Sequence, residues 1–181
     1  MTVSRARTAG GAAPARRRTG SRLAMLAVPT AVALAAAVAA AGPASAAAGG
    51  QINGYGGCLD VRGGSTDNFT PVQIYSCNQT DAQMWAPATP GNTLQAMGKC
   101  LDVQYGGTTD GTPVDLYDCN GTGAQVWIPQ GNGQFYNPQS NKCLDDTNWS
   151  ITSGTQAQIW DCDGAANQYW SPNWTFVTTG R

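Results

Sequence analysis

Three aspartates placed at a constant distance from an aromatic residue are the side chains of this sequence best suited to chemistry. Each follows a Cys-Leu pair, and each precedes the aromatic by 15 positions. An ionised carboxylate accepts hydrogen bonds from two neighbouring hydroxyls, and an aromatic ring covers an apolar C–H face, so the combination suits a sugar. A single aspartate could equally satisfy local backbone amides at a strand end, but the recurrence favours a ligand role. The pairs are Asp60 and Tyr75, Asp102 and Tyr117, and Asp145 and Trp160.

The same segments carry a longer repeat. In each copy the second cysteine follows the first by 19 positions and precedes a tryptophan by 8, so the repeat period is 42 and then 43 residues. A fixed period of this size indicates one supersecondary unit stacked on copies of itself, and three copies fit a closed threefold arrangement. We place the repeats at about 50–92, 93–134 and 135–176.

Short alternating runs such as Val72-Gln73-Ile74-Tyr75, separated by Gly, Asn, Thr and Pro, predict strands and turns, and no segment has helical periodicity. Roughly four short strands in each of three repeats predict an all-β fold, a twelve-strand β-trefoil rather than a propeller with few blades. The apolar side chains at alternate positions of the predicted strands are expected in the core. They comprise Leu59, Val72, Ile74, Leu101, Val114, Leu116, Leu144, Ala157 and Ile159.

All six cysteines follow an export signal, two in each repeat at one spacing, which predicts a disulfide framework. Six cysteines allow fifteen pairings, and the threefold repeat selects the pairing within repeats. A metal site is the rival interpretation, but the sequence has no histidine and no Cys-x-x-Cys spacing, so we expect no metal and no cofactor. The expected bridges are Cys58–Cys77, Cys100–Cys119 and Cys143–Cys162.

The spacing also predicts a register. If each bridge joins directly opposite residues of an antiparallel ladder, Asp60 lies opposite Tyr75, and the same relation holds in the later repeats. The carboxylate would then face the aromatic ring. One tryptophan per repeat is expected in the common core under the threefold axis. These are Trp85, Trp127 and Trp170.

Residues 1–46 are expected to be a secretory signal peptide, since six arginines without an acid precede an apolar run that ends in Ala44-Ser45-Ala46. An uncleaved membrane anchor is the alternative, which the weakly hydrophobic alanines and Pro29 disfavour. Sec or twin-arginine export is left open. Residues 47–181 would form a secreted, monomeric domain whose net charge is about −7, which disfavours nucleic acid or a membrane surface as partner.

The three Cys-Leu-Asp, Gln-x-aromatic-x-Cys and Gln-x-Trp motifs resemble those of the ricin-B-type lectin domain, a β-trefoil family that includes galactose-binding chains of plant toxins and xylan-binding modules. The resemblance covers about residues 50–175. It implies a carbohydrate-binding lectin whose partners are glycans or polysaccharide. The resemblance also implies the third-repeat site residues Asp145, Gln158, Trp160, Asn167 and Gln168.

The other two repeats match the family pattern less completely. The first carries Asp60, Gln73, Tyr75 and Gln83, with Ala82 in place of the family's asparagine, and the second carries Asp102, Tyr117 and Gln125, with Ala124 and Asp115 as departures. We expect the glutamine before each tryptophan to satisfy backbone groups. Losing one donor costs about 1 to 3 kcal/mol, enough to silence a weak site, so the expected order is third, first, second.

Two features limit these expectations. The segment Asp146-Thr147-Asn148-Trp149 lacks the glycine pair found at Gly63-Gly64 and Gly106-Gly107, so the rim of the third site is expected to differ. The second feature is the absence of Glu and His from the sequence, which removes the usual glycosidase acid and the usual base, and we therefore expect no enzyme. The paired acids Asp145-Asp146 and Asp161-Cys162-Asp163 are interpreted as solvated turns.

The competing functional class is an interaction protein. A secreted β-trefoil could inhibit a protease through an exposed loop while its sugar sites are degenerate, and such loops cannot be recognised from one sequence. The two classes differ in a simple observable, because only a sugar binder is retained on a glycan resin and eluted by free sugar.

Overall fold

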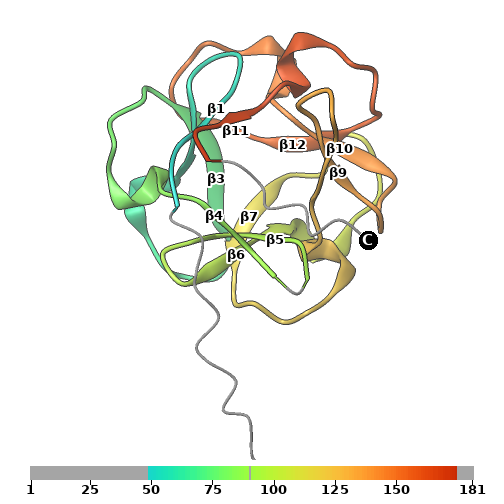
Figure 1. Cartoon of the computed structure of the whole chain (residues 1–181), viewed down its shortest axis with the longest axis horizontal. Helices are drawn as coiled ribbons and strands as arrows, with labels where there is room; N and C mark the ends of the chain where they lie inside the picture. The colour runs from blue at the N-terminus through green and yellow to red at the C-terminus, as the bar shows by residue number, and fades with distance from the viewer. Residues whose placement is uncertain (1–48, 90, 175–181) are drawn as a thin grey trace, which may run out of the picture. The chain divides into compact units, whose positions relative to one another are not determined.

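The computed structural model describes residues 49–89 and 91–174, which form thirteen strands (Figure 1). The predicted signal peptide, residues 1–46, lies outside these described residues. The strands are β1 (Ile52–Asn53), β2 (Cys58–Val61), β3 (Thr70–Tyr75), β4 (Ala86–Ala88), β5 (Thr93–Ala96), β6 (Lys99–Val103), β7 (Val114–Tyr117), β8 (Ile128–Pro129), β9 (Phe135–Asn137), β10 (Lys142–Asp145), β11 (Thr155–Gln156), β12 (Gln158–Trp160) and β13 (Ser171–Pro172).

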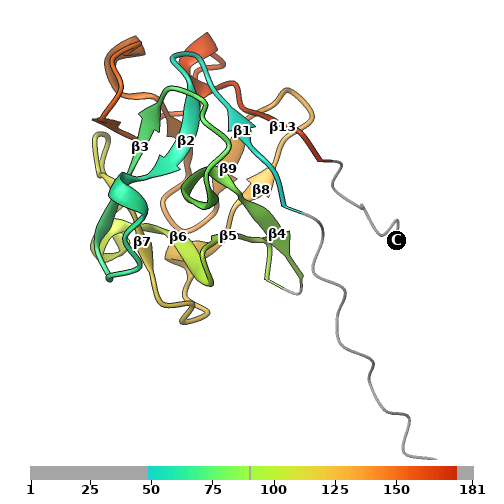
Figure 2. The ribbon, with the colours of Figure 1, turned by 90° about the vertical axis from the view of Figure 1, so that its left-hand side faces the viewer.

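The strands follow one plan repeated three times around a central axis (Figure 1), and Figure 2 shows the same fold from the side. The first and second repeats contribute four strands each. The third contributes five, because Ala157 separates β11 from β12 where the first repeat has the single strand β3. One sheet has the order β13-β1-β2-β3-β7-β6-β5-β4, with β11 paired to β3, and the other has the order β12-β10-β9-β8. All pairs are antiparallel, which confirms the predicted β-trefoil.

Six single-turn 3-10 helices connect the strands at equivalent places in the three repeats. Three follow the Cys-Leu-Asp strands and three carry the glutamine of the Gln-x-Trp motif. They are η1 (Arg62–Gly64), η2 (Asp81–Gln83), η3 (Gln104–Gly106), η4 (Gly123–Gln125), η5 (Thr147–Trp149) and η6 (Ala166–Gln168). Within residues 49–89 and 91–174, no helix is long and apolar enough to cross a membrane.

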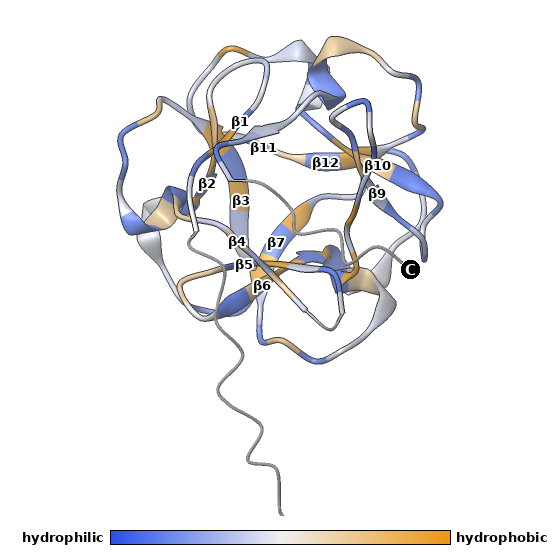
Figure 3. Cartoon of the chain, viewed as in Figure 1, coloured by the Kyte–Doolittle hydropathy of each residue, from blue (hydrophilic) through white to orange (hydrophobic). Residues whose placement is uncertain are grey.

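The core is formed by the alternate apolar residues of the strands, as the sequence predicts. All nine residues expected there, from Leu59 to Ile159, are fully buried, and hydrophobic residues concentrate on the strands around the centre of the fold (Figure 3). The three tryptophans of the Gln-x-Trp motifs are buried as well. Each indole N–H donates to the carbonyl of the leucine in its own Cys-Leu-Asp strand at 2.9 to 3.0 Å, so the polar atom of each large side chain is satisfied.

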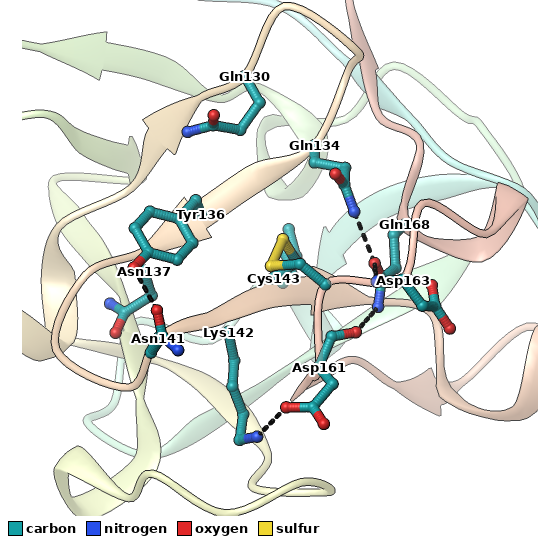
Figure 4. Close-up of a disulfide and its surroundings, with 12 residues drawn as sticks. Gln130, Gln134, Tyr136, Asn137, Asn141, Lys142, Cys143, Asp161, Asp163 and Gln168 are labelled. Atoms are coloured by element: carbon teal, nitrogen blue, oxygen red, sulfur yellow. Dashed lines mark hydrogen bonds and ion pairs between the residues drawn. A yellow bond between two sulfur atoms is a disulfide. The ribbon is translucent and has the colours of Figure 1, made fainter.

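Each repeat is closed by its own disulfide, as predicted. The bridges are Cys58–Cys77, Cys100–Cys119 and Cys143–Cys162, and each spans a Cα–Cα distance of 5.1 Å. In the third repeat the bridge lies beside Gln168, whose amide contacts Gln134 and the backbone of Asp161 (Figure 4). The disulfide thus links the chain just after β12, which ends at Trp160, to β10, which carries Asp145.

The predicted register is wrong by two residues. Cys58 pairs with Tyr75 and Asp60 pairs with Gln73, and the same shift occurs in the other repeats. The second cysteine lies beyond the end of the strand, so the disulfide joins diagonal rather than directly opposite positions. Because the shift is an even number of residues, the side chains keep the predicted face of the ladder. The carboxylate therefore has the amide, not the aromatic ring, directly opposite.

The repeats are joined by equivalent polar contacts just after Tyr75, Tyr117 and Trp160, which we call the platform aromatics, at the ends of the platform strands β3, β7 and β12. The backbone N–H of the residue that follows the aromatic donates to a side chain of the preceding repeat at 2.9 to 3.0 Å. In two of these joints a lysine contacts both partners. Lys99 donates to Asn68 and pairs with Asp118, and Lys142 pairs with both Asp110 and Asp161. The joints hold the ends of the platform strands in place. The three pairs are Ser76 with Ser153, Asp118 with Asn68, and Asp161 with Asp110.

Removing one disulfide tests how far the small core depends on it. Replacing Cys143 and Cys162 together by serine should lower the free energy of unfolding by about 3 kcal/mol, because each bridge closes a loop of about twenty residues in the unfolded chain. Urea unfolding of the oxidised proteins measures the difference. The equivalent replacement of Cys100 and Cys119 should give a similar loss, and unchanged stability in both variants would contradict the structural role.

Candidate functional site

The third repeat gathers its predicted polar residues around one carboxylate. Asp145 is buried at the end of β10 and accepts three amide hydrogen bonds. Gln158 donates to Oδ1 at 3.0 Å, whereas Asn167 and Gln168 donate to Oδ2 at 2.8 and 3.1 Å. These donors fix the orientation of the carboxylate and compensate for its burial.

Burial and hydrogen bonding oppose each other at this carboxylate. Burial raises the pKa of Asp145, the amides of Gln158, Gln168 and Asn167 lower it, and the negative charge of Asp163 raises it. The net result is a pKa above the ordinary value of 3.8. The amides thus reduce the electrostatic cost of the buried carboxylate without removing it.

A shallow pocket of about 170 Å³ opens over Asp145. Its wall includes Trp160, whose side chain is 41% exposed and therefore free to cover a ligand face. Asn167 also lines the pocket, and its Oδ1 is buried without a hydrogen-bond donor. The arrangement offers a carboxylate and an aromatic surface to one ligand. The remaining lining residues are Asn148, Trp149, Gln158 and Asp163.

The glutamine of each Gln-x-Trp motif is buried and bridges backbone groups, as the sequence predicts. In every repeat its amide nitrogen donates to the carbonyl that follows the platform aromatic, at 2.8 to 3.0 Å. Its side-chain oxygen accepts the backbone N–H that follows the second cysteine, at 2.8 to 3.2 Å. The glutamines Gln83, Gln125 and Gln168 therefore fix the loop around each disulfide.

In the first repeat the carboxylate is held by two amides. Gln73 donates to Asp60 at 2.8 Å and Gln83 donates at 3.0 Å. Arg62 donates from Nε to Gln73 at 2.8 Å, so a cation lies beside this group. Tyr75 is exposed, but Ala82 leaves the position of Asn167 without an amide. The first site is thus an incomplete version of the third.

In the second repeat a second carboxylate takes the place of the amide. Asp115 lies opposite Asp102 on the ladder, where the other repeats have glutamine. Asp115 is fully buried, and neither of its oxygens has a donor in hydrogen-bond geometry. Burial raises its pKa to about 7; the nearby amide of Gln104 opposes this shift and the charge of Asp102 adds to it. Burial also raises the pKa of Asp102, against the effect of Gln125.

The second repeat nevertheless has a larger pocket than the third. Its volume is about 380 Å³, and Asp102 and Tyr117 both line it. Sequence reasoning missed two of the other lining residues because they come from neighbouring repeats. Phe69 belongs to the first repeat and Gln139 to the third, so no motif within one repeat could identify them. The other lining residues are Tyr105, Gly106, Asn120, Thr122 and Ala124.

Asp146 is a further buried carboxylate, and the interpretation of Asp145-Asp146 as solvated turn residues is wrong. Asp146 is fully buried at the repeat position that Val61 and Val103 occupy in the core. Its carboxylate oxygens have no donor in hydrogen-bond geometry. Burial raises its pKa to about 7, although the nearby backbone N–H groups of Gly56 and Ser150 favour the charged form. Asp161 and Asp163 are exposed, as expected.

No cluster of three or more histidine, cysteine or acidic side chains suited to a metal ion occurs in the part of the chain that the structure describes. The third site instead combines one aspartate with neutral amides and an aromatic ring. Such a set is suited to hydrogen bonding of neutral polar ligands.

Comparison with protein families identifies this arrangement. The family of ricin-type beta-trefoil lectin domains matches residues 48–174. The chain therefore belongs to the ricin-type β-trefoil lectin domain family, as the threefold motifs predicted. No curated protein matches the sequence.

Several solved structures resemble the chain at 26 to 30% identity. The designed threefold-symmetric protein ThreeFoil has a TM-score of 0.65 at 30% identity, over 68% of this chain and 96% of its own. The agglutinin of Abrus precatorius has a TM-score of 0.63 at 27% identity, over 68% of this chain and 47% of its own. A non-toxic homologue of type II ribosome-inactivating proteins from Momordica charantia was solved with α-methyl-D-galactoside. It has a TM-score of 0.62 at 27% identity, over 70% of this chain and 48% of its own.

An enzyme also contains a similar domain. The exo-β-1,3-galactanase of Clostridium thermocellum has a TM-score of 0.64 at 26% identity, and the match covers 72% of this chain but 30% of the galactanase. The chain thus spans about half the length of the two plant proteins and about a third of the galactanase.

The two buried carboxylates without donors predict an unusual pH dependence of stability. Folded Asp115 and Asp146 hold their protons up to about pH 7, whereas the ordinary pKa is 3.8, so the folded chain binds more protons between these values. The free energy of unfolding should therefore fall as the pH rises from about 4 to about 7. Urea unfolding at pH 5 and pH 8 measures this loss.

Asparagine variants provide the control for this pH dependence. Asp115→Asn and Asp146→Asn keep the side-chain shape without a titrating proton, so the double variant should lose less stability than the wild type between pH 5 and pH 8. A wild type that is more stable at pH 8 than at pH 5 would contradict the burial of two unpaired carboxylates.

Proposed function

We propose that the chain is a secreted lectin that binds galactose-like or xylan-type glycans and that its third repeat is the main site. The observation that carries the proposal is the pocket over Asp145. Three amides hold this carboxylate, and Trp160 offers an exposed aromatic face. A sugar hydroxyl can donate to the carboxylate of Asp145, and the ring of Trp160 can cover an apolar C–H face.

The hydrogen-bonding capacity of Asp145 supports the same proposal. An ionised carboxylate has about four acceptor positions, and three of them are used by amides. The remaining position can accept from a hydroxyl of a sugar. Trp160 would cover the C–H face of the ring, since aromatic side chains bind apolar faces by contact.

The choice of sugar class is supported by the relatives. The homologue from Momordica charantia was solved with α-methyl-D-galactoside, and the Clostridium thermocellum protein is an exo-β-1,3-galactanase. Both are 26 to 27% identical to this chain. Galactose-containing glycans are therefore the first ligands to test, with xylan as the second.

The first and second repeats are proposed as weaker sites. The first lacks an amide at Ala82, and the second lacks one at Ala124 and has Asp115 opposite its carboxylate. Loss of one donor costs about 1 to 3 kcal/mol, whereas a millimolar affinity amounts to about 4 kcal/mol in total. The order proposed is the third repeat, then the first, then the second.

The remaining parts of the proposal concern processing and chemistry. We infer that residues 1–46 are removed on export and that residues 47–181 act as a monomeric domain without catalysis. Three disulfides support an oxidising compartment. The absence of Glu and His from the sequence supports binding without catalysis.

A protease inhibitor with a β-trefoil fold is the second candidate class. It would use an exposed loop and would not need an aligned carboxylate, amide and aromatic side chain. Passage of the protein over galactose, lactose and xylan resins separates the classes. Retention with elution by free sugar supports the lectin, and passage through all three resins would contradict it.

Two substitutions in the third repeat test the proposed order. Trp160→Ala removes the aromatic face and Asp145→Ala removes the charged acceptor, so each should cost about 1.5 to 3 kcal/mol of binding free energy. Such a loss exceeds a third of the binding free energy of a millimolar interaction, which is about 4 kcal/mol. Monosaccharide binding should therefore become undetectable by calorimetry.

The matched control is Asp102→Ala in the second repeat. It should change monosaccharide affinity little, although it could weaken polysaccharide binding if several sites act together. Each variant must keep the thermal midpoint of the wild type. Full binding by Asp145→Ala together with loss in Asp102→Ala would reverse the proposed order.

A further inference from the structure

Three aromatic residues adopt a left-handed backbone that is usual for glycine. Phe69, Tyr105 and Trp149 have φ values of 67°, 54° and 56°. A bulky residue at positive φ is an outlier, because its Cβ approaches the backbone too closely. Such residues persist where the surrounding structure or a function requires them.

The repeats show that glycine is the ordinary solution at these positions. Phe69 corresponds to Gly111 and Gly154, and both of those glycines also have positive φ. Trp149 corresponds to Gly64 and Gly106, which have φ values of 63° and 62°. The position of Tyr105 is occupied by Gly63 in the first repeat and by Asn148 in the third, again at positive φ. The aromatic side chains are thus not needed to form the turns.

All three aromatic residues line the two pockets. Phe69 and Tyr105 line the pocket of about 380 Å³ together with Asp102 and Tyr117. Trp149 lines the pocket of about 170 Å³ together with Asp145 and Trp160. They are also well exposed, at 41%, 82% and 49% for Phe69, Tyr105 and Trp149. Strained backbone and exposed apolar surface therefore coincide at the sites.

Ring contacts hold these side chains in place. Trp149 lies edge-on to Tyr55, with 5.4 Å between ring centroids. Phe69 lies 5.2 Å from Tyr105 and 4.9 Å from the platform Tyr117. Contacts of this kind restrict the rings before a ligand arrives, which reduces the entropy lost on binding.

We propose that Phe69, Tyr105 and Trp149 form a second aromatic wall of the pockets and bind a further sugar unit, so that the sites prefer oligosaccharides to monosaccharides. The proposal rests on the glycan binding proposed above. Asp102 or Asp145 and the platform aromatic would hold one sugar, and the second wall would cover the neighbouring one. The volume of the larger pocket lies within the range of about 300 to 1,000 Å³ that is typical of ligand sites.

The triple variant Phe69→Gly, Tyr105→Gly, Trp149→Gly tests this role. Calorimetry compares galactose with a β-1,3-linked galactotriose, and xylose with xylotriose. The variant should lose about tenfold in trisaccharide affinity, because aromatic contacts are lost, while monosaccharide affinity changes by less than about twofold. Its melting temperature should rise by roughly 2 to 5 °C, since glycine relieves the left-handed strain.

Gln79→Gly is the matched control. Gln79 has a φ of 60°, corresponds to Gly121 and Gly164, and lines neither pocket. This variant should gain stability in the same way without any change in the affinity for either class of sugar. The single variants Trp149→Gly and Tyr105→Gly then assign the trisaccharide effect to the third or the second pocket.

The outcomes separate this proposal from the proposed function. A wild type that binds neither a monosaccharide nor a trisaccharide overturns both. If the wild type binds sugar but the triple variant keeps its trisaccharide affinity, or loses both affinities equally, the second wall is overturned and the lectin function stands. A lower melting temperature of the triple variant would show that the aromatic residues stabilise the turns, which would also overturn the proposal.

Discussion

The antiparallel pairing that sets Asp145 opposite Gln158 and Cys143 opposite Trp160 fixes the geometry of the third pocket. The carboxylate of Asp145 and the ring of Trp160 lie on one face of the ladder, because Trp160 is two residues beyond the partner of Asp145. Burying an ionised carboxylate is costly without donors, and Gln158, Asn167 and Gln168 supply donors to Asp145 from β12 and η6. The disulfide and the core tryptophan anchor the same two segments, so the fold and the site depend on one set of contacts.

Departures from threefold symmetry distinguish the three repeats. Asp115 and Asp146 place unpaired carboxylates where the other repeats have an amide or a valine, and burial raises both pKa values to about 7. The buried Asp146 lies next to the third site, where its backbone carbonyl accepts from Asn167 at 3.1 Å. Stability is thus reduced close to the sites, in agreement with the general tendency of proteins to concentrate strain at functional positions.

The sequence predicts the repeat, the disulfides, the core and the lectin family, because these follow from a fixed spacing and from the alternation of side chains along a strand. It does not predict the register, since the second cysteine lies beyond the end of its strand and the bridge joins diagonal positions. The signal for the correct register was the amide Gln73 or Gln158, which has the right spacing to pair with the aspartate.

Motifs within one repeat could not identify the residues that other repeats contribute to its pocket. Phe69 and Gln139 reach the second pocket from the first and third repeats, and Tyr55 reaches Trp149 from the opposite end of the domain sequence. The burial of Asp146 has a detectable signal, because alignment of the repeats places it with Val61 and Val103. The signal was overridden by the usual preference of adjacent acids for solvent.

The most direct measurement of sugar recognition uses the tryptophan indole N–H groups in a two-dimensional NMR titration with galactose and β-1,3-linked galactotriose. The indole of Trp160 lines the third pocket, whereas those of Trp85, Trp127 and Trp170 donate to core carbonyls. Binding at the third repeat predicts a saturable shift of the Trp160 signal, assigned with Trp160→Phe, and no shift of the three core signals. No shift of the Trp160 signal at saturating sugar, with sugar binding detected by calorimetry, would contradict the placement of the main site in the third repeat.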